Sequence, residues 1–487
     1  MYTKGDLELV SNNRNYISLF FSYGLSLLVV GLSYIYYSKK LSVAEFGLYS
    51  IALTIGAIGI FLLDGGLKIA IIKGDEQLSP RKQGVLLSWL FAISVVLSLL
   101  FLLIRYPLEY FIPSTSDDYL FLSLFAIVYL LSYPFIVIPT AFLERKLNYQ
   151  RLAWVEATSI ALERGLPVIL LMRSSMGIYS FVIALVLGRS FRALAVCSAH
   201  PVRPCLPKRM ELKDVAPLMV EGGWVQLATG FSLIRDNLHV LLIGPLYGKI
   251  WVGYYSWGLQ LCMLLSQAFA QVSARISLPR MAQTNEPSHR WEICITQVRL
   301  LVILTFPLLP AAMIVLPGIN NWLFAGKWEP VFALLPFLFA RMVAGMAMTP
   351  VGVLVPVQSG GYVFARATIL WTLMEIVAAL LAIVCFGTRG LAISYSLMAY
   401  FGLVIYIKAI GILPASRTKE LFRIIFFRPA LLVSFGAFGL LFAYGKSAGI
   451  FYGLLPSWIV VVVLAIIIVS YASEKEIWRY ILRTENS

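Results

Sequence analysis

Charged residues are scarce in this chain of 487 residues. Asp, Glu, Lys and Arg together make up 13% of the sequence, whereas hydrophobic residues make up 60%. A soluble domain carries about 25% charged residues and about 45–50% apolar ones. Apolar runs of about 20 residues recur along the chain, and each is long enough to cross about 30 Å of hydrocarbon as a helix. The composition therefore excludes an ordinary soluble domain and predicts an integral membrane protein.

Sequence signatures of metal sites, ATPases and common hydrolases are also missing. The five cysteines are scattered without a C-x-x-C pair, so neither a disulfide framework nor a metal site is predicted. No G-x-x-x-x-G-K-[ST], H-E-x-x-H or G-x-S-x-G motif occurs, which argues against direct ATP use and against the hydrolases that carry these motifs. The segments between the apolar runs are too short for a soluble catalytic domain. We therefore expect a protein that is not an enzyme and that uses no cofactor or metal.

The apolar runs predict an all-α, polytopic membrane protein. Backbone polar groups have no water partners in lipid, so spanning segments must be helices or a closed barrel. Barrel strands would show alternation over about 10 residues, and these runs do not. We predict fourteen spans, at residues 15–37, 46–72, 84–104, 119–143, 152–172, 176–198, 216–243, 250–274, 293–316, 331–356, 362–386, 390–410, 424–445 and 449–472.

The net charge of +15 is unevenly distributed between the two sides of the predicted membrane protein. The two termini and the even-numbered loops carry more than twice as many Lys and Arg residues as the odd-numbered loops. Basic loops face the cytoplasm, so both termini are predicted to be cytoplasmic in a multi-pass protein. The basic clusters at 203–213 and 417–428 could instead indicate nucleic acid or anionic lipid. No nucleic-acid-binding motif supports the first of these, and we expect no nucleic-acid partner.

A short stretch occurs twice in the chain. "EFGLYS" (45–50) and "WVGYYS" (251–256) lie 206 positions apart, and each opens an apolar run. The same offset places the first span on the seventh and the second on the eighth, which predicts a parallel repeat around a central cavity. The predicted domains are two six-helix lobes, 1–205 and 206–412, followed by two further helices and a tail in 413–487. We interpret Gly47 and Gly253 as close-packing or turn positions, and Tyr49 and Tyr255 as interfacial anchors.

Ionisable residues inside the spans are the candidate site, because such residues are costly in lipid and usually face an interior. Cations outnumber acids there, and Arg presents planar donors that match phosphate. The predicted substrate-binding cations are Lys68, Arg164, Arg235, Arg341 and Arg366. The predicted charge partners or ion-coupling groups are Asp64, Glu156, Glu163 and Asp236.

Two alternatives remain open for these charges. Each cation could pair with an acid on a neighbouring helix, and Asp64 could pair with Lys68 because residues four apart share a helical face. Long side chains near a span end could instead reach the membrane interface. We favour that second interpretation for Arg189, Arg192, Arg275 and Arg299, which lie near predicted cytoplasmic ends.

Several stretches resemble the polysaccharide-transporter flippases. "SKKLSVAEFGLYSIALTIGAIGIFLLDGGLKIAI" (38–71) is similar to their second-span signature, and "RDNLHVLLIGPLYGKIWVGYYSWGLQL" (235–261) is similar to their seventh and eighth spans. "ARISLPRMAQ" (274–283) and "FAGKWEP" (324–330) match further landmarks in the same order. This family belongs to the multidrug/oligosaccharidyl-lipid/polysaccharide superfamily. In "DGG" the chain departs slightly from the many members that have another residue before the second glycine.

The resemblance implies a transporter of lipid-linked oligosaccharide. Its members carry undecaprenyl-diphosphate-linked units from the cytoplasmic to the outer leaflet of the bacterial inner membrane, for surface polysaccharide such as O-antigen, capsule or exopolysaccharide. Its fold would be two six-helix lobes around a cationic cavity, and a glycan polymerase and other assembly proteins would be candidate partners. The alternatives are a multidrug extruder of the same superfamily and a membrane glycan polymerase or ligase. The dominance of basic residues in the spans argues against the first, and the short odd-numbered loops argue against the second.

Overall fold

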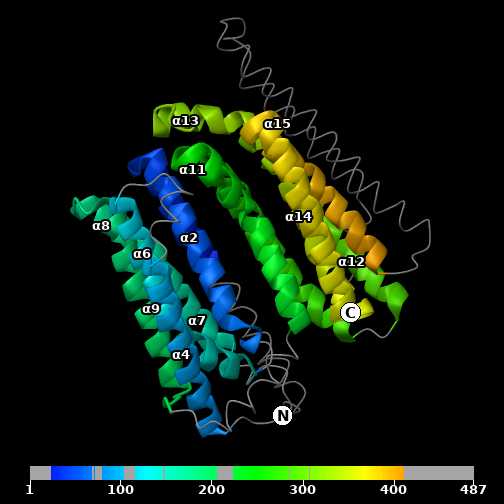
Figure 1. The fold of residues 1–487 in the computed structure, drawn as a ribbon. Coiled ribbons are helices and arrows are strands. Elements are labelled where there is room, and N and C mark those ends of the chain that lie inside the picture. Colours follow the sequence, from blue (N-terminus) through cyan, green and yellow to red (C-terminus); the bar gives the residue numbers. More distant parts are fainter. Residues whose placement is uncertain are drawn as a thin grey trace, which may run out of the picture. The chain divides into compact units, whose positions relative to one another are not determined.

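The computed structural model describes residues 24–68, 71, 79–103, 116–145, 149–205, 223–283, 286–305 and 308–410. Within these residues every regular element is helical, as the ribbon in Figure 1 shows. Residue contacts divide the chain into two compact units, Met1–Trp257 (unit 1) and Gly258–Ser487 (unit 2).

Helix α2 (Val43–Asp64) of unit 1 has defined signals at both ends. The Ser42 backbone N–H donates to the Glu45 carboxylate at 2.8 Å, and the Glu45 N–H donates to the Ser42 hydroxyl at 3.2 Å. This reciprocal capping box satisfies two donors that a helix start leaves free. The helix ends at Gly65, whose φ of 50° and ψ of 19° are left-handed. The duplicated stretch 45–50 therefore lies in the first turns of α2.

The remaining helices of unit 1 pack around α6 (Ser116–Arg145), which contacts α2, α4 (Pro80–Leu103) and α9 (Ser180–Ala199). Residues 24–40 form the helix before α2. Between α6 and α9 the chain forms α7 (Tyr149–Ile160), the π-helical turn η1 (Ala161–Gly165), α8 (Leu166–Arg173) and the short η2 (Gly177–Tyr179). Part of the unit's core lies between α4 and α6, where Leu86, Leu90, Ile138 and Ala141 are fully buried.

Helix α11 (Gly223–Gln283) carries two predicted spans in one element. Gly248, with φ 75° and ψ 177°, breaks the helical geometry between them. The part before the break lies beside α2, because the Thr54 hydroxyl donates to the Asn237 side-chain oxygen at 2.9 Å and Gly230 packs against the Phe61 ring. Residues of α11 up to Trp257 belong to unit 1.

Unit 2 is built on α14 (Leu335–Ser359), which packs against α12 (Pro287–Thr305) and α15 (Gly361–Ala409). Helix α13 (Leu308–Phe324) and the short η3 (Glu329–Ala333) connect α12 to α14. Helix α15 is broken at Gly387, whose φ is 64°. The core among α12, α14 and α15 contains the large side chains Trp291, Trp371 and Tyr406.

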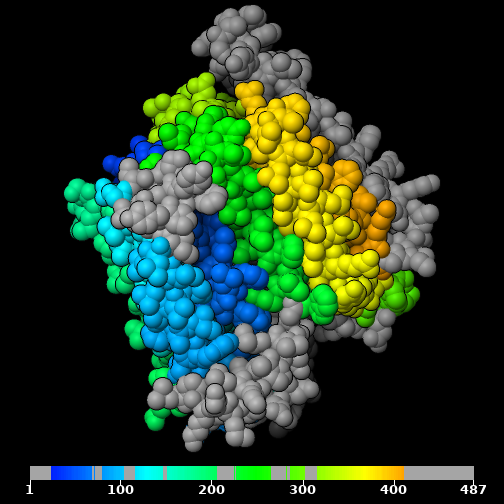
Figure 2. Space-filling view, in the orientation of Figure 1, coloured from blue at the N-terminus to red at the C-terminus, as the bar shows by residue number. Residues whose placement is uncertain are grey.

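Apolar side chains are exposed along the outer faces of several helices. Leu103 on α4 is 77% exposed and Val384 on α15 is 79% exposed, and α4 lies at the surface in Figure 2. Six of the described helical segments, α2, α4, α6, the stretch Gly177–Ala199, α14 and α15, are long and apolar enough to cross a membrane. Exposed apolar faces of this size suit contact with lipid chains.

Each of the predicted spans two to twelve overlaps a described helix, and the all-α prediction is confirmed for the described residues. Span two differs at its end, because α2 stops at Asp64, before the left-handed Gly65, and not at residue 72. The turn at Gly248 separates predicted spans seven and eight, and the turn at Gly387 separates eleven and twelve. The start of the first span and all of spans thirteen and fourteen lie outside the described residues. The total of fourteen spans and the lobe boundaries at 205 and 412 therefore stay predictions.

Candidate functional site

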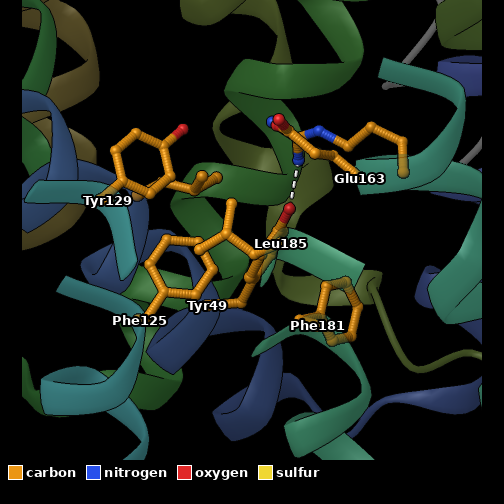
Figure 3. A pocket seen from close by; sticks show the side chains of 8 residues that line it. Tyr49, Phe125, Tyr129, Glu163, Phe181 and Leu185 are labelled. Atoms are coloured by element: carbon orange, nitrogen blue, oxygen red, sulfur yellow. Dashed lines mark hydrogen bonds between the residues drawn. The ribbon is translucent and has the colours of Figure 1, made fainter. Parts of the chain in front are cut away.

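Arg164 lies inside unit 1 and has tyrosine partners. It sits on η1, a π-helical turn of the kind that often marks a functional position in a helix. Its guanidinium donates to the Tyr49 hydroxyl on α2, and its backbone carbonyl accepts from the Tyr37 hydroxyl. Figure 3 shows the Arg164–Tyr49 bond. The guanidinium carbon also lies 5.6 Å from the Tyr49 ring centroid, within cation–π range.

Aromatic rings surround this arginine. Tyr49 packs against Phe181 with ring centroids 4.4 Å apart, and Phe125 stacks on Tyr129 at 5.4 Å. These four side chains line a small pocket together with Leu53, Glu163, Arg164 and Leu185. The free space is about 10 Å³, which holds about one water molecule. In this conformation the pocket admits neither a sugar nor a diphosphate.

Glu163 shares the pocket with Arg164. The Ser159 hydroxyl donates to the Glu163 carboxylate at 3.1 Å, one turn earlier on the same helical stretch. Gly188 of α9 lies directly against the Glu163 side chain and Ser159, so that a Cβ at position 188 would overlap the Glu163 side chain. A close helix crossing thus positions the carboxylate.

Arg189 on α9 is a second cation in the interior of unit 1. Only 9% of the residue is exposed, and its guanidinium carbon lies 3.5 Å from the centroid of the Tyr129 ring. It donates to the Ser132 hydroxyl at 3.4 Å, and its Nε has no hydrogen-bond partner among the described residues. Within the described part of the chain Arg189 forms no ion pair. A buried charge without a carboxylate is costly, and the tyrosine ring offsets part of that cost.

Arg192, one turn further along α9, is paired. It contacts the Glu156 carboxylate of α7 at 2.8 Å. Asp64, at the end of α2, accepts a hydrogen bond from the Tyr133 hydroxyl of α6 at 2.9 Å. The predicted acids Asp64 and Glu156 are therefore both engaged within unit 1, each with a different neighbouring helix.

The predicted pair between Asp64 and Lys68 does not form. Because α2 ends at Gly65 in left-handed geometry, the two residues do not share one helical face. Lys68 instead contacts Glu144 of α6 at 2.9 Å, with the two side chains 38% and 23% exposed. The four-residue spacing of Asp64 and Lys68 would bring them together only in a helix that continued through Gly65 and Gly66.

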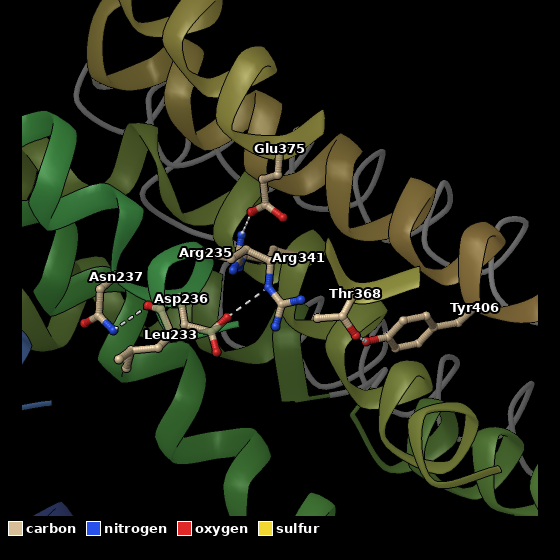
Figure 4. Close-up of polar contacts among 8 residues, drawn as sticks. All are labelled: Leu233, Arg235, Asp236, Asn237, Arg341, Thr368, Glu375 and Tyr406. Atoms are coloured by element: carbon tan, nitrogen blue, oxygen red, sulfur yellow. Dashed lines mark hydrogen bonds and ion pairs between the residues drawn. The ribbon is translucent and has the colours of Figure 1, made fainter. Parts of the chain in front are cut away.

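Arg235 and Asp236 are neighbours on α11 and pair with each other at 3.2 Å, as Figure 4 shows. The Arg235 side chain is 10% exposed, whereas that of Asp236 is 48% exposed. Arg235 is therefore an interior residue of the α11 segment in unit 1, partly neutralised by its own neighbour.

In unit 2, Arg341 of α14 has a carboxylate partner. It donates to Glu375 of α15 at 2.7 Å, and the Glu375 side chain is 0% exposed (Figure 4). The guanidinium carbon of Arg341 also lies 4.1 Å from the Tyr395 ring centroid. Arg366, on the same α15, is exposed.

The structure brings together only part of the predicted site. Arg164 and Glu163 share one pocket, whereas Arg341 and Arg366 belong to the other unit. No three His, Cys, Asp or Glu side chains among the described residues lie close enough to hold a metal ion.

Four interior residues have positions that the sequence did not predict. Arg189 is buried rather than extended to an interface, and Tyr49 and Tyr255, at 5% and 0% exposed, are not interfacial anchors. Tyr255 stacks on His239 with ring centroids 5.4 Å apart. Tyr129 was not singled out. A signal existed for Arg189: it follows Phe181 and Leu185 at four-residue spacing, which is one helical face.

Comparisons with known proteins agree with this architecture. A family model described as "Polysaccharide biosynthesis protein" matches residues 39–333. The lipopolysaccharide biosynthesis protein WzxC of Escherichia coli (strain K12) is 21% identical over 368 residues, which cover 73% of this chain and 71% of WzxC.

Solved structures of transporters are similar in fold. The lipid II flippase MurJ in an inward closed conformation superposes with a TM-score of 0.69 at 13% identity, covering 96% of this chain and 99% of MurJ. An inward-facing multidrug resistance MATE family transporter of the MOP superfamily gives 0.54 at 14% identity, covering 83% and 95%. The Vibrio cholerae MATE transporter VcmN in its bent form gives 0.52 at 13% identity, covering 84% and 97%. These likenesses confirm the predicted polytopic membrane fold.

Proposed function

This chain belongs to the polysaccharide biosynthesis protein family, and from that premise we propose that it is a flippase for lipid-linked oligosaccharides. The substrate would be an undecaprenyl-diphosphate-linked oligosaccharide, moved from the cytoplasmic to the outer leaflet of the bacterial inner membrane. The lipid tail would stay in the bilayer while the diphosphate and sugars cross through the protein. Support comes from the similarity to WzxC, described as a lipopolysaccharide biosynthesis protein, and to the lipid II flippase MurJ. The basic interior of unit 1 is a second line of support.

The observation that carries this proposal is positive charge in unit 1 that no ion pair neutralises. Arg164 bonds to a tyrosine hydroxyl and Arg189 stacks on a tyrosine ring, and within the described residues neither forms an ion pair. Glu163 lines the same pocket as Arg164 and offsets part of the charge of that arginine. Arg189 does not line this pocket. A guanidinium group whose partners are neutral can exchange them for an anion, which forms stronger, charge-assisted hydrogen bonds.

A diphosphate headgroup is the anion that suits this arrangement. Phosphate oxygens accept paired, charge-assisted hydrogen bonds from Arg, and these are about twice as strong as neutral ones. Because the pocket holds only about one water in the present conformation, headgroup binding requires α2 and η1 to separate. Arg164 would then exchange the Tyr49 hydroxyl for a phosphate oxygen. Lys68, Arg235, Arg341 and Arg366 remain predicted contacts.

The membrane potential could drive this transfer. One elementary charge crossing the membrane is worth about 2.3 kcal/mol per 100 mV. A dianionic headgroup therefore gains about twice that on leaving a negative interior, and the inside-negative potential favours outward movement. Asp64, Glu156, Glu163 and Asp236 are the acids available for an additional coupled proton or cation.

Two other functions predict different chemistry. A multidrug extruder would bind cationic compounds, which an interior with unneutralised arginines repels. A glycan polymerase or ligase would need catalytic groups on the outer face. The flippase is therefore the proposal, a glycan polymerase is a candidate partner, and both termini are proposed to be cytoplasmic.

The deciding experiment deletes the gene and locates the lipid-linked oligosaccharide. A flippase defect leaves intact repeat units on the cytoplasmic leaflet, where an impermeant glycan-binding probe does not reach them in spheroplasts. If unpolymerised units instead accumulate on the outer face, the protein is a polymerase or ligase. If the units are distributed normally while cells become sensitive to cationic drugs, it is a multidrug extruder.

A pair of matched variants then tests the arginine. Arg164→Gln removes the charge from the pocket, whereas Arg173→Gln removes one from the exposed end of α8. At equal membrane abundance we expect the first to restore outer-leaflet transfer at least tenfold more slowly than the wild type, and the second to match the wild type. Equal rates for both variants would exclude Arg164 as a headgroup contact.

A further inference from the structure

The two copies of the duplicated stretch meet each other in unit 1. The first, 45–50, opens α2, and the second, 251–256, follows the break at Gly248 in α11. Gly47 and Gly253 occupy the same position in the two copies. The α2 and α11 backbones come together at these two glycines, so the sequence repeat is also a point of physical contact.

The contact is reciprocal. A Cβ added to Gly47 would collide with the carbonyl oxygen of Lys249 and would lie 2.9 Å from the Gly253 nitrogen. A Cβ added to Gly253 would collide with the carbonyl oxygen of Val43. Val43 and Lys249 are also 206 positions apart, so they are equivalent residues of the two copies. Gly47 of the first copy faces Lys249, and Gly253 of the second copy faces Val43. This is the isologous pattern of a two-fold related interface, here within one chain.

Side chains close the same region. The Tyr34 hydroxyl donates to the Trp257 carbonyl at 2.5 Å, and the Trp257 ring nitrogen donates to the Ser38 hydroxyl at 2.8 Å. Lys249 pairs with Asp118 at the start of α6. These bonds tie the residues that flank the second copy to the helix 24–40 and to α6, which both belong to the first predicted lobe.

The contact lies on the side of the predicted outer loops. Residues 41–42 connect the first helix to α2, and residues 244–249 precede the second copy, and both are odd-numbered loops in the predicted topology. From this end α2 and the first part of α11 run antiparallel, with Thr54 bonded to Asn237 and Phe61 against Gly230. The glycine contact is thus the outermost point of this seam.

We propose that the Gly47–Gly253 contact is the gate that closes the transport path on the outer side, and that the two copies of the motif separate there to release the headgroup. The proposal rests on the proposed function. Glycine is required at both positions because the closed state brings backbone against backbone. A side chain at either position obstructs closure and shifts the protein toward its outward-open state.

Accessibility from outside tests the gate without measuring transport. In a variant whose five native cysteines are replaced, Ser50→Cys reports on the buried face next to the contact, since Ser50 is 8% exposed. We expect Gly47→Ala to raise the labelling rate of this cysteine by an impermeant maleimide, added outside intact cells, at least fivefold. Gly31→Ala is the matched control, because a Cβ there meets no atom within 4 Å. Equal labelling of the Gly47→Ala and Gly31→Ala variants would overturn the gate.

A cross-link keeps the test decisive where an alanine variant fails to fold. The Thr54 and Asn237 side chains meet at 2.9 Å across the same seam, so that Thr54→Cys with Asn237→Cys can form a disulfide without adding a side chain to either glycine. Oxidation is expected to lower transfer of lipid-linked oligosaccharide at least tenfold, and reduction is expected to restore it. Undiminished transfer with the cross-link complete contradicts the gate while leaving the flippase proposal intact. If the parent protein without the introduced cysteine pair transfers no lipid-linked oligosaccharide although the maleimide result holds, the flippase proposal fails while the closure at the two glycines stands.

Discussion

Each unit contains an arginine stacked on a tyrosine, and the two stacks differ in what neutralises the charge. In unit 1, Arg189 of α9 lies over Tyr129 of α6, and in unit 2, Arg341 of α14 lies over Tyr395 of α15. Arg189 and Tyr395 are 206 positions apart, so they are equivalent in the repeat. The helix that carries the arginine in unit 1 therefore corresponds to the one that carries the tyrosine in unit 2. Arg341 has a fully buried carboxylate at 2.7 Å, whereas the hydrogen-bond partner of Arg189 among the described residues is a hydroxyl at 3.4 Å.

This difference separates a structural charge from an available one. The Arg341–Glu375 pair is internally compensated, and its main effect is to hold α14 against α15. Among the described residues Arg189 and Arg164 form no ion pair, so positive charge in the interior of unit 1 is offset only in part, by Tyr129 and by the nearby Glu163. We therefore propose that unit 1 supplies the stronger contacts to the headgroup.

The largest predicted effect comes from breaking the compensated stack. Glu375→Gln removes the buried carboxylate that pairs with Arg341, and removal of one partner of a buried pair costs about 3–5 kcal/mol. We expect a large drop in the thermal unfolding temperature of the purified protein. The double variant Arg341→Met with Glu375→Leu should recover most of it, since an apolar pair of similar volume replaces both charges. A single variant as stable as the wild type would contradict the assignment.

Removing the charge of Arg189 should not lower the free energy of unfolding, in contrast to Glu375→Gln. Arg189→Met keeps a long side chain beside Tyr129 but deletes the buried charge, so the unfolding free energy should be unchanged or raised by about 1 kcal/mol. Transfer of lipid-linked oligosaccharide should fall in the same variant, as is common where function requires a destabilised site. Thermal unfolding and flipping are measured on one preparation. A loss of stability like that of Glu375→Gln would show that Arg189 is structural.

The ring beneath Arg189 should contribute a smaller amount. Tyr129→Leu removes the aromatic face and is expected to cost about 0.5–2 kcal/mol, whereas Tyr129→Phe keeps the face and should cost less. The comparison is made by chemical or thermal unfolding of both variants. Equal losses would indicate that the hydroxyl, not the ring, is the stabilising group.

The smallest effect is expected at the partly exposed pair of unit 1. Lys68 and Glu144 are 38% and 23% exposed, and pairs of this kind contribute up to about 1 kcal/mol. A double-mutant cycle with Lys68→Ala and Glu144→Ala measures the coupling energy. A coupling as large as that of Arg341 with Glu375 would remove the distinction between exposed and buried pairs drawn here.

The sequence was sufficient for the helices and for where several of them end. Apolar runs predicted spans two to twelve, each of which overlaps a described helix. They placed the start of span two at residue 46, whereas the capping pair Ser42 and Glu45 starts α2 at Val43. The repeated glycines were interpreted as close-packing positions, and the contact between Gly47 and Gly253 confirms this. These features are local, or depend on composition, and so can be inferred without knowledge of the packing.

The partners of the charged residues could not be inferred in the same way. Asp64 and Lys68 have the spacing of an ion pair, but Gly65 ends the helix between them. Arg189 lies near a predicted span end, and its burial depends on how α6 and α9 cross. Tyr49 has the composition of an interfacial anchor and instead meets Arg164 from another helix. Each of these outcomes is decided by which helices become neighbours, which periodicity does not encode.

The central proposal is that Arg164 and Arg189 of unit 1 contribute more to headgroup binding than the Arg341–Glu375 pair of unit 2. Its most direct test compares flipping of an undecaprenyl-diphosphate-linked oligosaccharide in proteoliposomes for two stable double variants. We predict that Arg164→Gln with Arg189→Met lowers the initial rate at least tenfold, while Arg341→Met with Glu375→Leu retains at least half of the wild-type rate. A normal rate in the first variant together with a tenfold loss in the second would contradict the account.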